Sequence, residues 1–176
     1  MSTAAAPYAS LLVATGVERL TELAVSTRNA RWAFARGGVE QGRAHYPPMV
    51  GVHAALLGSC LVEVVVADRP FIPALGWPML GLVLGAQGLR WWCVTTLGRQ
   101  WNTRVIVVPG MPLVTAGPYR WLRHPNYVAV VVEVAALPLV HTAWVSAIVF
   151  SLANAALLAV RIRVEERALE DVATTR

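Results

Sequence analysis

The sequence is short of charge and contains no lysine. Charged residues make up 14% of its 176 residues and hydrophobic residues make up 56%, whereas soluble domains carry roughly 25% charged residues. A chain of this length forms one domain, and so little charge cannot cover the surface of a water-soluble one. All 15 basic residues are arginine, against 10 acidic residues. The composition therefore predicts a single domain embedded in a membrane.

Cysteine is scarce, and two common signatures of function are missing. Cys60 and Cys93 both lie inside apolar runs, and their spacing matches no metal site or disulfide framework, so we expect no metal and interpret both as small core residues. No Gly-x-Gly-x-x-Gly follows a predicted strand, which argues against a Rossmann domain. The net charge of +5 is spread between apolar runs. It therefore indicates membrane topology and not binding to nucleic acid.

What the sequence does contain is long apolar runs. A helix needs about 20 residues to cross the roughly 30 Å core of a bilayer. The 34 residues from Tyr127 to Val160 would make one helix of about 51 Å. This is too long for one span, so Pro138 and His141 are predicted to mark a tight turn. We therefore expect an all-α integral membrane domain over residues 1–176 with about five transmembrane helices, at residues 8–25, 49–67, 73–92, 127–139 and 142–160.

The arginines alternate between the connections that join these runs. They gather after the first, third and fifth runs, whereas the second connection holds only the cancelling pair Asp68 and Arg69 and the fourth only His141. Because positive residues concentrate on the cytoplasmic side, we expect the amino terminus outside and the carboxyl terminus in the cytoplasm. The expected location is the cell membrane, in contact with its lipids; the oligomeric state is left open.

The third connection is unusually polar. It contains Leu97-Gly-Arg-Gln-Trp-Asn-Thr-Arg104 and then Val114-Thr-Ala-Gly-Pro-Tyr-Arg-Trp-Leu-Arg-His-Pro-Asn-Tyr127. Pro125 suits the first turn of a helix, so Asn126 and Tyr127 are predicted to open the fourth helix, whose free amides suit an anionic group. This polar density predicts a cytoplasmic site within residues 97–127. An interfacial belt, with aromatic rings at headgroup depth and arginines on lipid phosphates, explains the same residues equally well.

A second charged segment follows the fifth run, at residues 161–171. It begins Arg161-Ile-Arg-Val-Glu-Glu-Arg. On a helix, Arg161 and Glu165 lie one turn apart, and such ion pairs contribute only about 0.2–0.5 kcal/mol each. A charge run that leaves a span is usually a solvated helix face. Taken alone, this segment therefore favours a helix exterior over a site.

Together the two segments are more specific than either alone. Gly117-Pro-Tyr-Arg-Trp-Leu-Arg-His-Pro-Asn-Tyr127, a helical hairpin and then Arg161-x-x-x-Glu-Glu166 resemble the isoprenylcysteine carboxyl methyltransferase family of integral membrane enzymes. The resemblance covers the carboxyl-terminal half. It implies a helical cytoplasmic lobe that binds S-adenosylmethionine without a Rossmann fold and releases S-adenosylhomocysteine.

The amino-terminal half resembles a bacterial branch of that family. The segments concerned are Glu18-Arg-Leu-Thr-Glu-Leu23, Ser26-Thr-Arg-Asn29, Gly37-Gly-Val-Glu-Gln-Gly42 and His45-Tyr-Pro-Pro-Met-Val50. This branch accompanies type III polyketide synthases. The resemblance implies O-methylation of a lipophilic acceptor, a long-chain alkylpyrone or alkylresorcinol.

The family resemblance also implies roles for single residues. Arg161 would orient the acceptor oxygen and favour its anionic form. A hydroxyl acceptor further needs a base, for which His45 and Glu133 are candidates; an ionisable residue in mid-span usually faces a partner or a cavity. The residues expected to bind the cofactor are Tyr119, Arg123, His124, Pro125, Asn126, Tyr127, Glu165 and Glu166.

Two other functions fit the same sequence. Within the family, the acceptor would be the carboxyl group of a prenylated cysteine, which is already anionic at neutral pH. From a different class, the chain would be a non-enzymatic membrane carrier or scaffold whose arginines only set topology. Saturable binding of S-adenosylhomocysteine separates an enzyme from a carrier.

Overall fold

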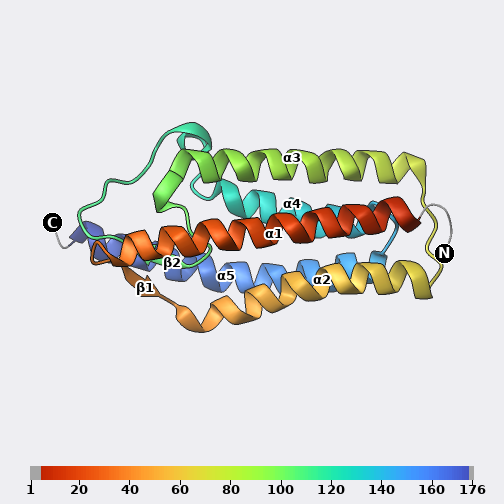
Figure 1. Cartoon of the computed structure of the whole chain (residues 1–176), viewed down its shortest axis with the longest axis horizontal. Helices are drawn as coiled ribbons and strands as arrows, with labels where there is room; N and C mark the ends of the chain where they lie inside the picture. Colours follow the sequence, from red (N-terminus) through yellow and green to blue (C-terminus); the bar gives the residue numbers. More distant parts are fainter. Residues whose placement is uncertain (1–4, 175–176) are drawn as a thin grey trace.

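Five helices in the predicted order make up most of the protein. The computed structural model describes residues 5–174, with the side chains of residues 6–168. The expectation of an all-α fold holds apart from two short strands and three short 3-10 helices. The helices are α1 (Ala5–Phe34), α2 (Tyr46–Val66), α3 (Pro73–Leu97), α4 (Pro125–Leu139) and α5 (Trp144–Thr174), shown in Figure 1.

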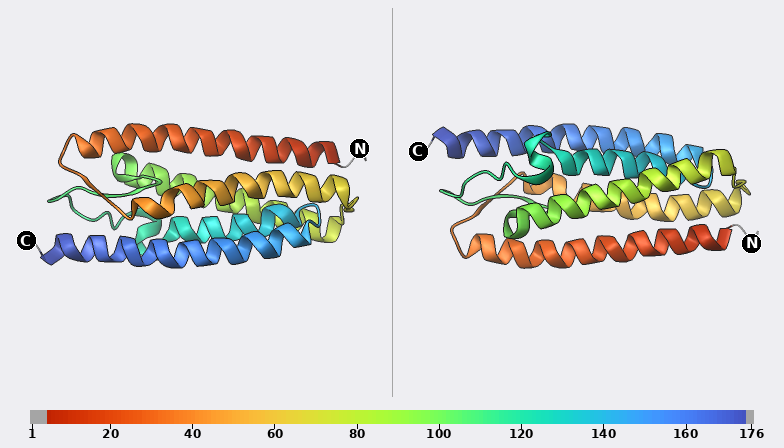
Figure 2. Two further views of the ribbon diagram at one scale, coloured as in Figure 1. Left: turned by 90° about the horizontal axis from the view of Figure 1, so that it is seen from below. Right: turned by 90° about the horizontal axis from the view of Figure 1, so that it is seen from above.

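The helices form one elongated bundle. They run along its long axis, and the start of α1 and the end of α5 lie at opposite ends (Figures 1 and 2). α4 packs against both α3 and α5, and α2 packs against α1 and α5. The long connection between α3 and α4 lies at the end where α1 finishes (Figure 1). The fold therefore gathers the polar connections at one end of the bundle.

The core holds small and medium apolar side chains from every helix. Cys60 and Cys93 are free, and both are 0% exposed, so the prediction that they are core residues is confirmed. Tyr8 is also buried, and its hydroxyl donates a hydrogen bond to the carbonyl oxygen of Leu137 at 3.1 Å. A buried hydroxyl needs such a partner. This bond joins the start of α1 to the end of α4.

The prediction of five membrane spans is not confirmed. Among the described residues, two segments are long and apolar enough to cross a membrane, Arg43–Val66 and Trp144–Ala168. α4 has 15 residues, about 22 Å of helix, which is shorter than a bilayer core of roughly 30 Å. The span predicted at residues 8–25 carries Glu18, Arg19 and Glu22 within α1. These charges make α1 too polar to cross a membrane without partner helices.

The turn between α4 and α5 lies where helix length predicted it. α4 ends at Leu139 and α5 begins at Trp144, with His141 between them. Glu63 of α2 fixes the turn, because its carboxylate accepts hydrogen bonds from the amides of Val145 (3.1 Å) and Ser146 (2.7 Å). A carboxylate is favourable at the amino-terminal end of a helix. Glu63 therefore acts as a cap for α5.

A small sheet closes the opposite end of the bundle. β1 (Val39–Gln41) pairs antiparallel with β2 (Val105–Val107). Glu40 of β1 forms ion pairs with Arg43 at 3.1 Å and with Arg104 at 3.7 Å. The sheet ties the connection after α1 to the connection after α3. It was not expected, because three-residue strands are too short to give a recognisable alternation of apolar and polar residues.

Candidate active site

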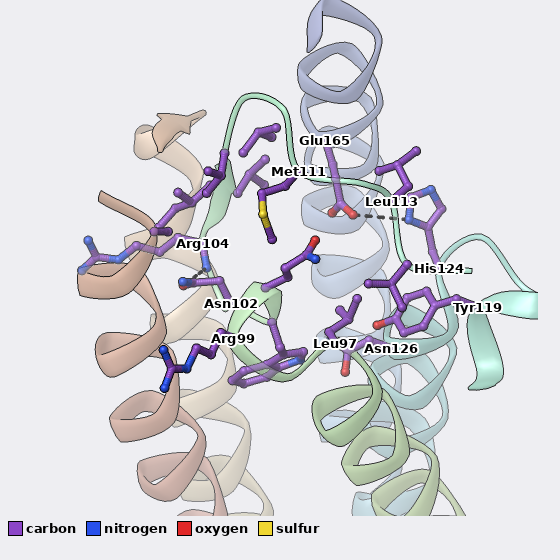
Figure 3. A pocket seen from close by; sticks show the side chains of 18 of the residues that line it. Leu97, Arg99, Asn102, Arg104, Met111, Leu113, Tyr119, His124, Asn126 and Glu165 are labelled. Atoms are coloured by element: carbon purple, nitrogen blue, oxygen red, sulfur yellow. Dashed lines mark hydrogen bonds and ion pairs between the residues drawn. The ribbon is translucent and has the colours of Figure 1, made fainter. Parts of the chain in front are cut away.

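A cavity of about 710 Å³ lies at the end of the bundle that the sheet closes. Its walls come from the end of α1, residues 97–115, the start of α4 and the polar part of α5. Figure 3 shows this cavity from close by. Its volume lies within the range of roughly 300–1,000 Å³ that is usual for small-molecule sites. Segments that are far apart in the sequence therefore build one pocket.

The cavity brings together most of the residues that the sequence predicted. Pro125 does not line it; its side chain is fully buried at the start of α4. The side chains of residues 169–171, at the end of the predicted site, lie outside the described residues. The predicted residues that line the cavity are Tyr119, Arg123, His124, Asn126, Tyr127, Arg161, Glu165 and Glu166.

A chain of hydrogen bonds crosses the inner wall of the cavity. Arg161 is 5% exposed, and its Nε donates to the Tyr127 hydroxyl at 2.7 Å while its Nη1 donates to the Thr103 carbonyl at 2.6 Å. The Tyr127 hydroxyl in turn donates to the Glu165 carboxylate. Among the described residues, no carboxylate lies within ion-pair distance of Arg161. The buried guanidinium is therefore suited to an anionic group in the cavity.

His124 lies beside the Glu165 end of this chain of hydrogen bonds, at ion-pair distance from two carboxylates. Its Nδ1 is 3.7 Å from a Glu165 oxygen and its Nε2 is 3.6 Å from a Glu166 oxygen. Its ring stacks on the Tyr127 ring, with 5.3 Å between the centroids. Figure 3 shows His124 and Glu165 pointing toward each other across the cavity edge. Hydrogen bonding to Glu165, followed by the charges of both carboxylates, raises the pKa of His124 above its ordinary value.

This raised pKa gives a test by pH. A histidine whose pKa is higher in the folded protein stabilises the fold fully below the free-histidine pKa of about 6.5. That contribution is lost as the pH rises through the pKa of the folded state. We expect His124→Gln to lower the melting temperature more at pH 6 than at pH 9, measured by thermal unfolding in detergent. A difference that stays constant or grows with pH would contradict the ion pairs.

Tyr119 and Asn126 also line the cavity, below His124 in the view of Figure 3. Burial raises the pKa of the Tyr119 hydroxyl above its ordinary value, so this group remains a proton donor at neutral pH. The Oδ1 atom of Asn126 is buried and has no hydrogen-bond partner among the described residues. A buried acceptor without a partner is costly. Asn126 can therefore accept a hydrogen bond from a ligand in this cavity.

The opposite wall carries residues to which the sequence assigned no role. Arg99, Asn102 and Arg104 line it, together with Trp32 of α1, and Figure 3 shows the first three on the side of the cavity away from Glu165. Arg99, Asn102 and Arg104 belong to the polar connection that the sequence singled out. Trp32 lies in α1, and no sequence signal connects it with residues about 70 positions away. Carboxylates and guanidinium groups therefore both line the cavity: Glu165, Glu166 and Arg161 come from α5, and Arg99 and Arg104 come from the connection after α3.

The two residues predicted as bases lie outside the cavity. His45 ends a 3-10 helix, Arg43–His45, that packs against α5. Glu133 is 3% exposed inside the bundle, and its carboxylate contacts Arg90 at 2.5 Å and Arg19 at 3.1 Å. These ion pairs occupy the carboxylate. The structure therefore gives Glu133 a place in the helix packing and neither residue a place against the cavity.

A family of known proteins matches the part of the sequence that builds this site. The sequence profile of the isoprenylcysteine carboxyl methyltransferase family matches residues 79–171, which include every residue of the chain of hydrogen bonds from Thr103 to Glu166. The chain belongs to this family. Membership indicates methyltransferase activity and a membrane location, and members of the family use S-adenosylmethionine.

Two relatives resemble the chain over most of its length. An uncharacterized protein of Bacillus subtilis, YpbQ, is 38% identical over 156 residues, which is 88% of this chain and 92% of the relative. An uncharacterized protein of Haemophilus influenzae is 23% identical over 154 residues, 86% of this chain and 88% of the relative. Similarity over this length includes α2 and at least part of α1, which precede the residues that the family profile matches.

Proposed function

We propose that the protein transfers a methyl group from S-adenosylmethionine to an oxygen of a lipophilic acceptor at the cytoplasmic membrane interface. The observation that carries this proposal is the single cavity that unites the start of α4 with Arg161, Glu165 and Glu166 of α5. Acidic, aromatic and basic groups all face it. A carrier or scaffold has no need of such convergence of polar side chains.

The residues of the cavity suit the cofactor. Glu165 and Glu166 offer carboxylates to an ammonium or to ribose hydroxyls, and the buried Oδ1 of Asn126 offers an acceptor without a partner in the described structure. Protonated His124 and Arg123 suit a carboxylate, and Tyr119 and Tyr127 supply aromatic faces. When bound, the cofactor supplies an electrophilic methyl group.

The work of the protein in such a transfer is positioning and exclusion of water. Arg161 holds its charge in a buried place beside Tyr127, where it would orient the acceptor oxygen and favour its anion. With His45 and Glu133 outside the cavity, electrostatic stabilisation of the anion by Arg161 is better supported than removal of a proton by either residue. An acceptor that is acidic in solution fits this arrangement.

The membrane arrangement we propose follows the arginine pattern. The end of the bundle with the cavity faces the cytoplasm, the amino terminus is outside and the carboxyl terminus is inside; residues 1–4 and 175–176 lie outside the described chain. α2 and α5 cross the bilayer. α1 packs on α2, α4 packs on α5 and α3 packs on α4, so that the five helices form one domain of about five spans. The acceptor then enters from the bilayer and the cofactor from the cytoplasm.

For the acceptor we propose a long-chain polyketide, an alkylpyrone or an alkylresorcinol. The sequence segments of α1 and of residues 37–50 that resemble this bacterial branch support it. None of their residues lines the cavity, but β1, within one of them, pairs with β2, which does. The second candidate is the carboxyl group of a prenylated cysteine, which the description of the matching family favours.

Binding and turnover test this function directly. Calorimetry of the purified protein is expected to show saturable binding of S-adenosylhomocysteine, weakened about 10- to 100-fold in His124→Ala and Glu166→Ala because each removes a charged hydrogen-bonding group. Labelled S-adenosylmethionine offered with an alkylpyrone, an alkylresorcinol and a prenylcysteine is expected to label a polyketide. Exclusive labelling of the prenylcysteine would reverse the order of the two acceptors, and absence of saturable binding would refute the enzyme.

A further inference from the structure

Two buried polar residues of α1 have no part in the site as described so far. Ser26 is 3% exposed and Asn29 is 5% exposed. They lie three residues apart, so both are on the same face of the helix. Buried polar side chains are almost always hydrogen-bonded. Their partners therefore show what this face of α1 does.

Ser26 holds the segment that follows α3. Its Oγ donates to Asn102 Oδ1 at 2.7 Å, accepts the amide of Thr103 at 3.0 Å and lies 2.7 Å from Thr103 Oγ1. A serine hydroxyl has one donor and two acceptor positions. All three contacts of the Ser26 hydroxyl are with residues 102 and 103.

Asn29 holds the beginning of the same segment. Its Nδ2 donates to the carbonyl oxygens of Gly98 at 3.0 Å and Trp101 at 2.7 Å. Gly98 has a positive φ of 53°, which ends α3 and turns the chain back toward α1. Trp101 is 3% exposed and lines the cavity. Asn29 therefore fixes the turn at residues 98–101, which forms part of the cavity wall.

The segment leads directly to Arg161. The Thr103 carbonyl accepts a hydrogen bond of 2.6 Å from Arg161 Nη1, and the amide of the same residue is held by Ser26. The other side of the guanidinium donates to the Tyr127 hydroxyl. One peptide segment thus connects α1 with the cation that faces the cavity.

We propose that Ser26 and Asn29 are positioning residues for Arg161, and that α1 sets the acceptor end of the site through residues 98–103. This inference rests on the proposed methyl transfer. The two side chains touch neither the predicted cofactor residues His124, Glu165 and Glu166 nor the cavity itself. Loss of either should therefore disturb the acceptor and leave cofactor binding in place.

The physical link is tested first without any ligand. Ser26→Ala and Asn29→Ala are compared with Thr27→Ala, whose lost hydroxyl is exposed and bonds only to the Leu23 carbonyl of its own helix at 2.8 Å. Amide hydrogen exchange of residues 98–104 in detergent is expected to be at least about tenfold faster in the two variants and unchanged in the control. Exchange as slow as in the wild type would overturn the proposal.

Kinetics then test the consequence for the reaction. With a labelled methyl donor and a lipophilic acceptor, we expect kcat/KM for the acceptor to fall about tenfold or more in both variants, consistent with the loss of two or three hydrogen bonds. S-adenosylhomocysteine should bind within twofold of wild type, and Ser26→Thr, which keeps the hydroxyl, should restore turnover. A parallel loss of both properties, or unchanged turnover, would overturn the positioning role. A wild type that neither binds nor turns over would refute the proposed function, while the exchange measurement would still decide the link.

Discussion

Replacing Arg161 by alanine is expected to lower turnover by about 10²–10³-fold, the loss that follows removal of a group that stabilises a developing or bound anion. The reason is its place in the structure. Its guanidinium is buried, lines the cavity and is held between the Tyr127 hydroxyl and the Thr103 carbonyl. No other described guanidinium makes these two contacts. The measurement is methyl transfer to a lipophilic acceptor at saturating cofactor.

Two further variants separate charge from geometry. Arg161→Lys keeps the charge but cannot donate in two fixed directions at once, so we expect it to restore only a small part of the turnover. Arg163→Ala is the matched control, because Arg163 lies on the exposed side of α5 two residues away and does not line the cavity. We expect the control to keep wild-type turnover. S-adenosylhomocysteine should bind Arg161→Ala within about tenfold of wild type.

Some results would contradict this role. If Arg161→Ala turns over at the wild-type rate, the acceptor oxygen is held elsewhere, and Arg99 and Arg104 on the opposite wall become the candidates. If it loses cofactor binding in proportion to turnover, Arg161 supports the cofactor end through Tyr127 and Glu165. Thermal unfolding of each variant shows whether a loss comes from the site or from the fold.

The sequence predicted the features that depend on neighbouring residues. Proline at the first turn marked the start of α4, and the length of an apolar run located the turn near His141. The last predicted span ends at residue 160, and the charged segment that follows, for which the sequence favoured a helix exterior, continues α5 to Thr174. Its periodicity did not show that part of this helix faces a cavity. This continuation carries Arg161, Glu165 and Glu166.

Contacts between distant residues could not be predicted in this way. Glu133 was recognised as an unusual ionisable residue, but its partners Arg90 and Arg19 lie 43 and 114 residues away. Ser26 and Asn29 were quoted only as part of a resemblance, and nothing in their spacing indicates residues 98–103. Such pairings depend on how the helices pack, which a single sequence does not determine. These contacts place the Glu133 carboxylate inside the bundle, paired with Arg90 and Arg19.

The burial of Glu133 predicts that replacing it lowers the stability of the fold strongly and changes the rate of methyl transfer little. Its side chain is 4% exposed, as is that of Arg90, to which it is paired at 2.5 Å. Breaking such a buried pair from one side costs about 3–5 kcal/mol, because the remaining charge is compensated too little. Without Glu133, Arg90 and Arg19 would share the buried carboxylate of Glu22, at 3.4 and 2.8 Å. We expect Glu133→Leu to lose about this much stability, measured by thermal or denaturant unfolding in detergent. Turnover per folded molecule should stay within a few-fold of wild type.

Removing both partners is the decisive comparison. In Arg90→Met combined with Glu133→Leu, the Arg90 guanidinium no longer faces an apolar side chain. Arg19 loses its contact with Glu133 at 3.1 Å but keeps its ion pair with Glu22 at 2.8 Å. Replacing both members of a buried pair by apolar residues is often close to neutral, so the double variant should recover most of the stability lost in Glu133→Leu.

A control on the edge of the same cluster shows that the effect comes from burial. Glu18 is 3.5 Å from Arg19, and its side chain is 18% exposed, so Glu18→Gln should cost less than about 1 kcal/mol. The opposite pattern would restore the original role of Glu133. If Glu133→Leu folds as stably as wild type but no longer methylates a hydroxyl acceptor, the Glu133 carboxylate of the wild type serves the reaction as a base. The ion pairs with Arg90 and Arg19 would then only position that carboxylate.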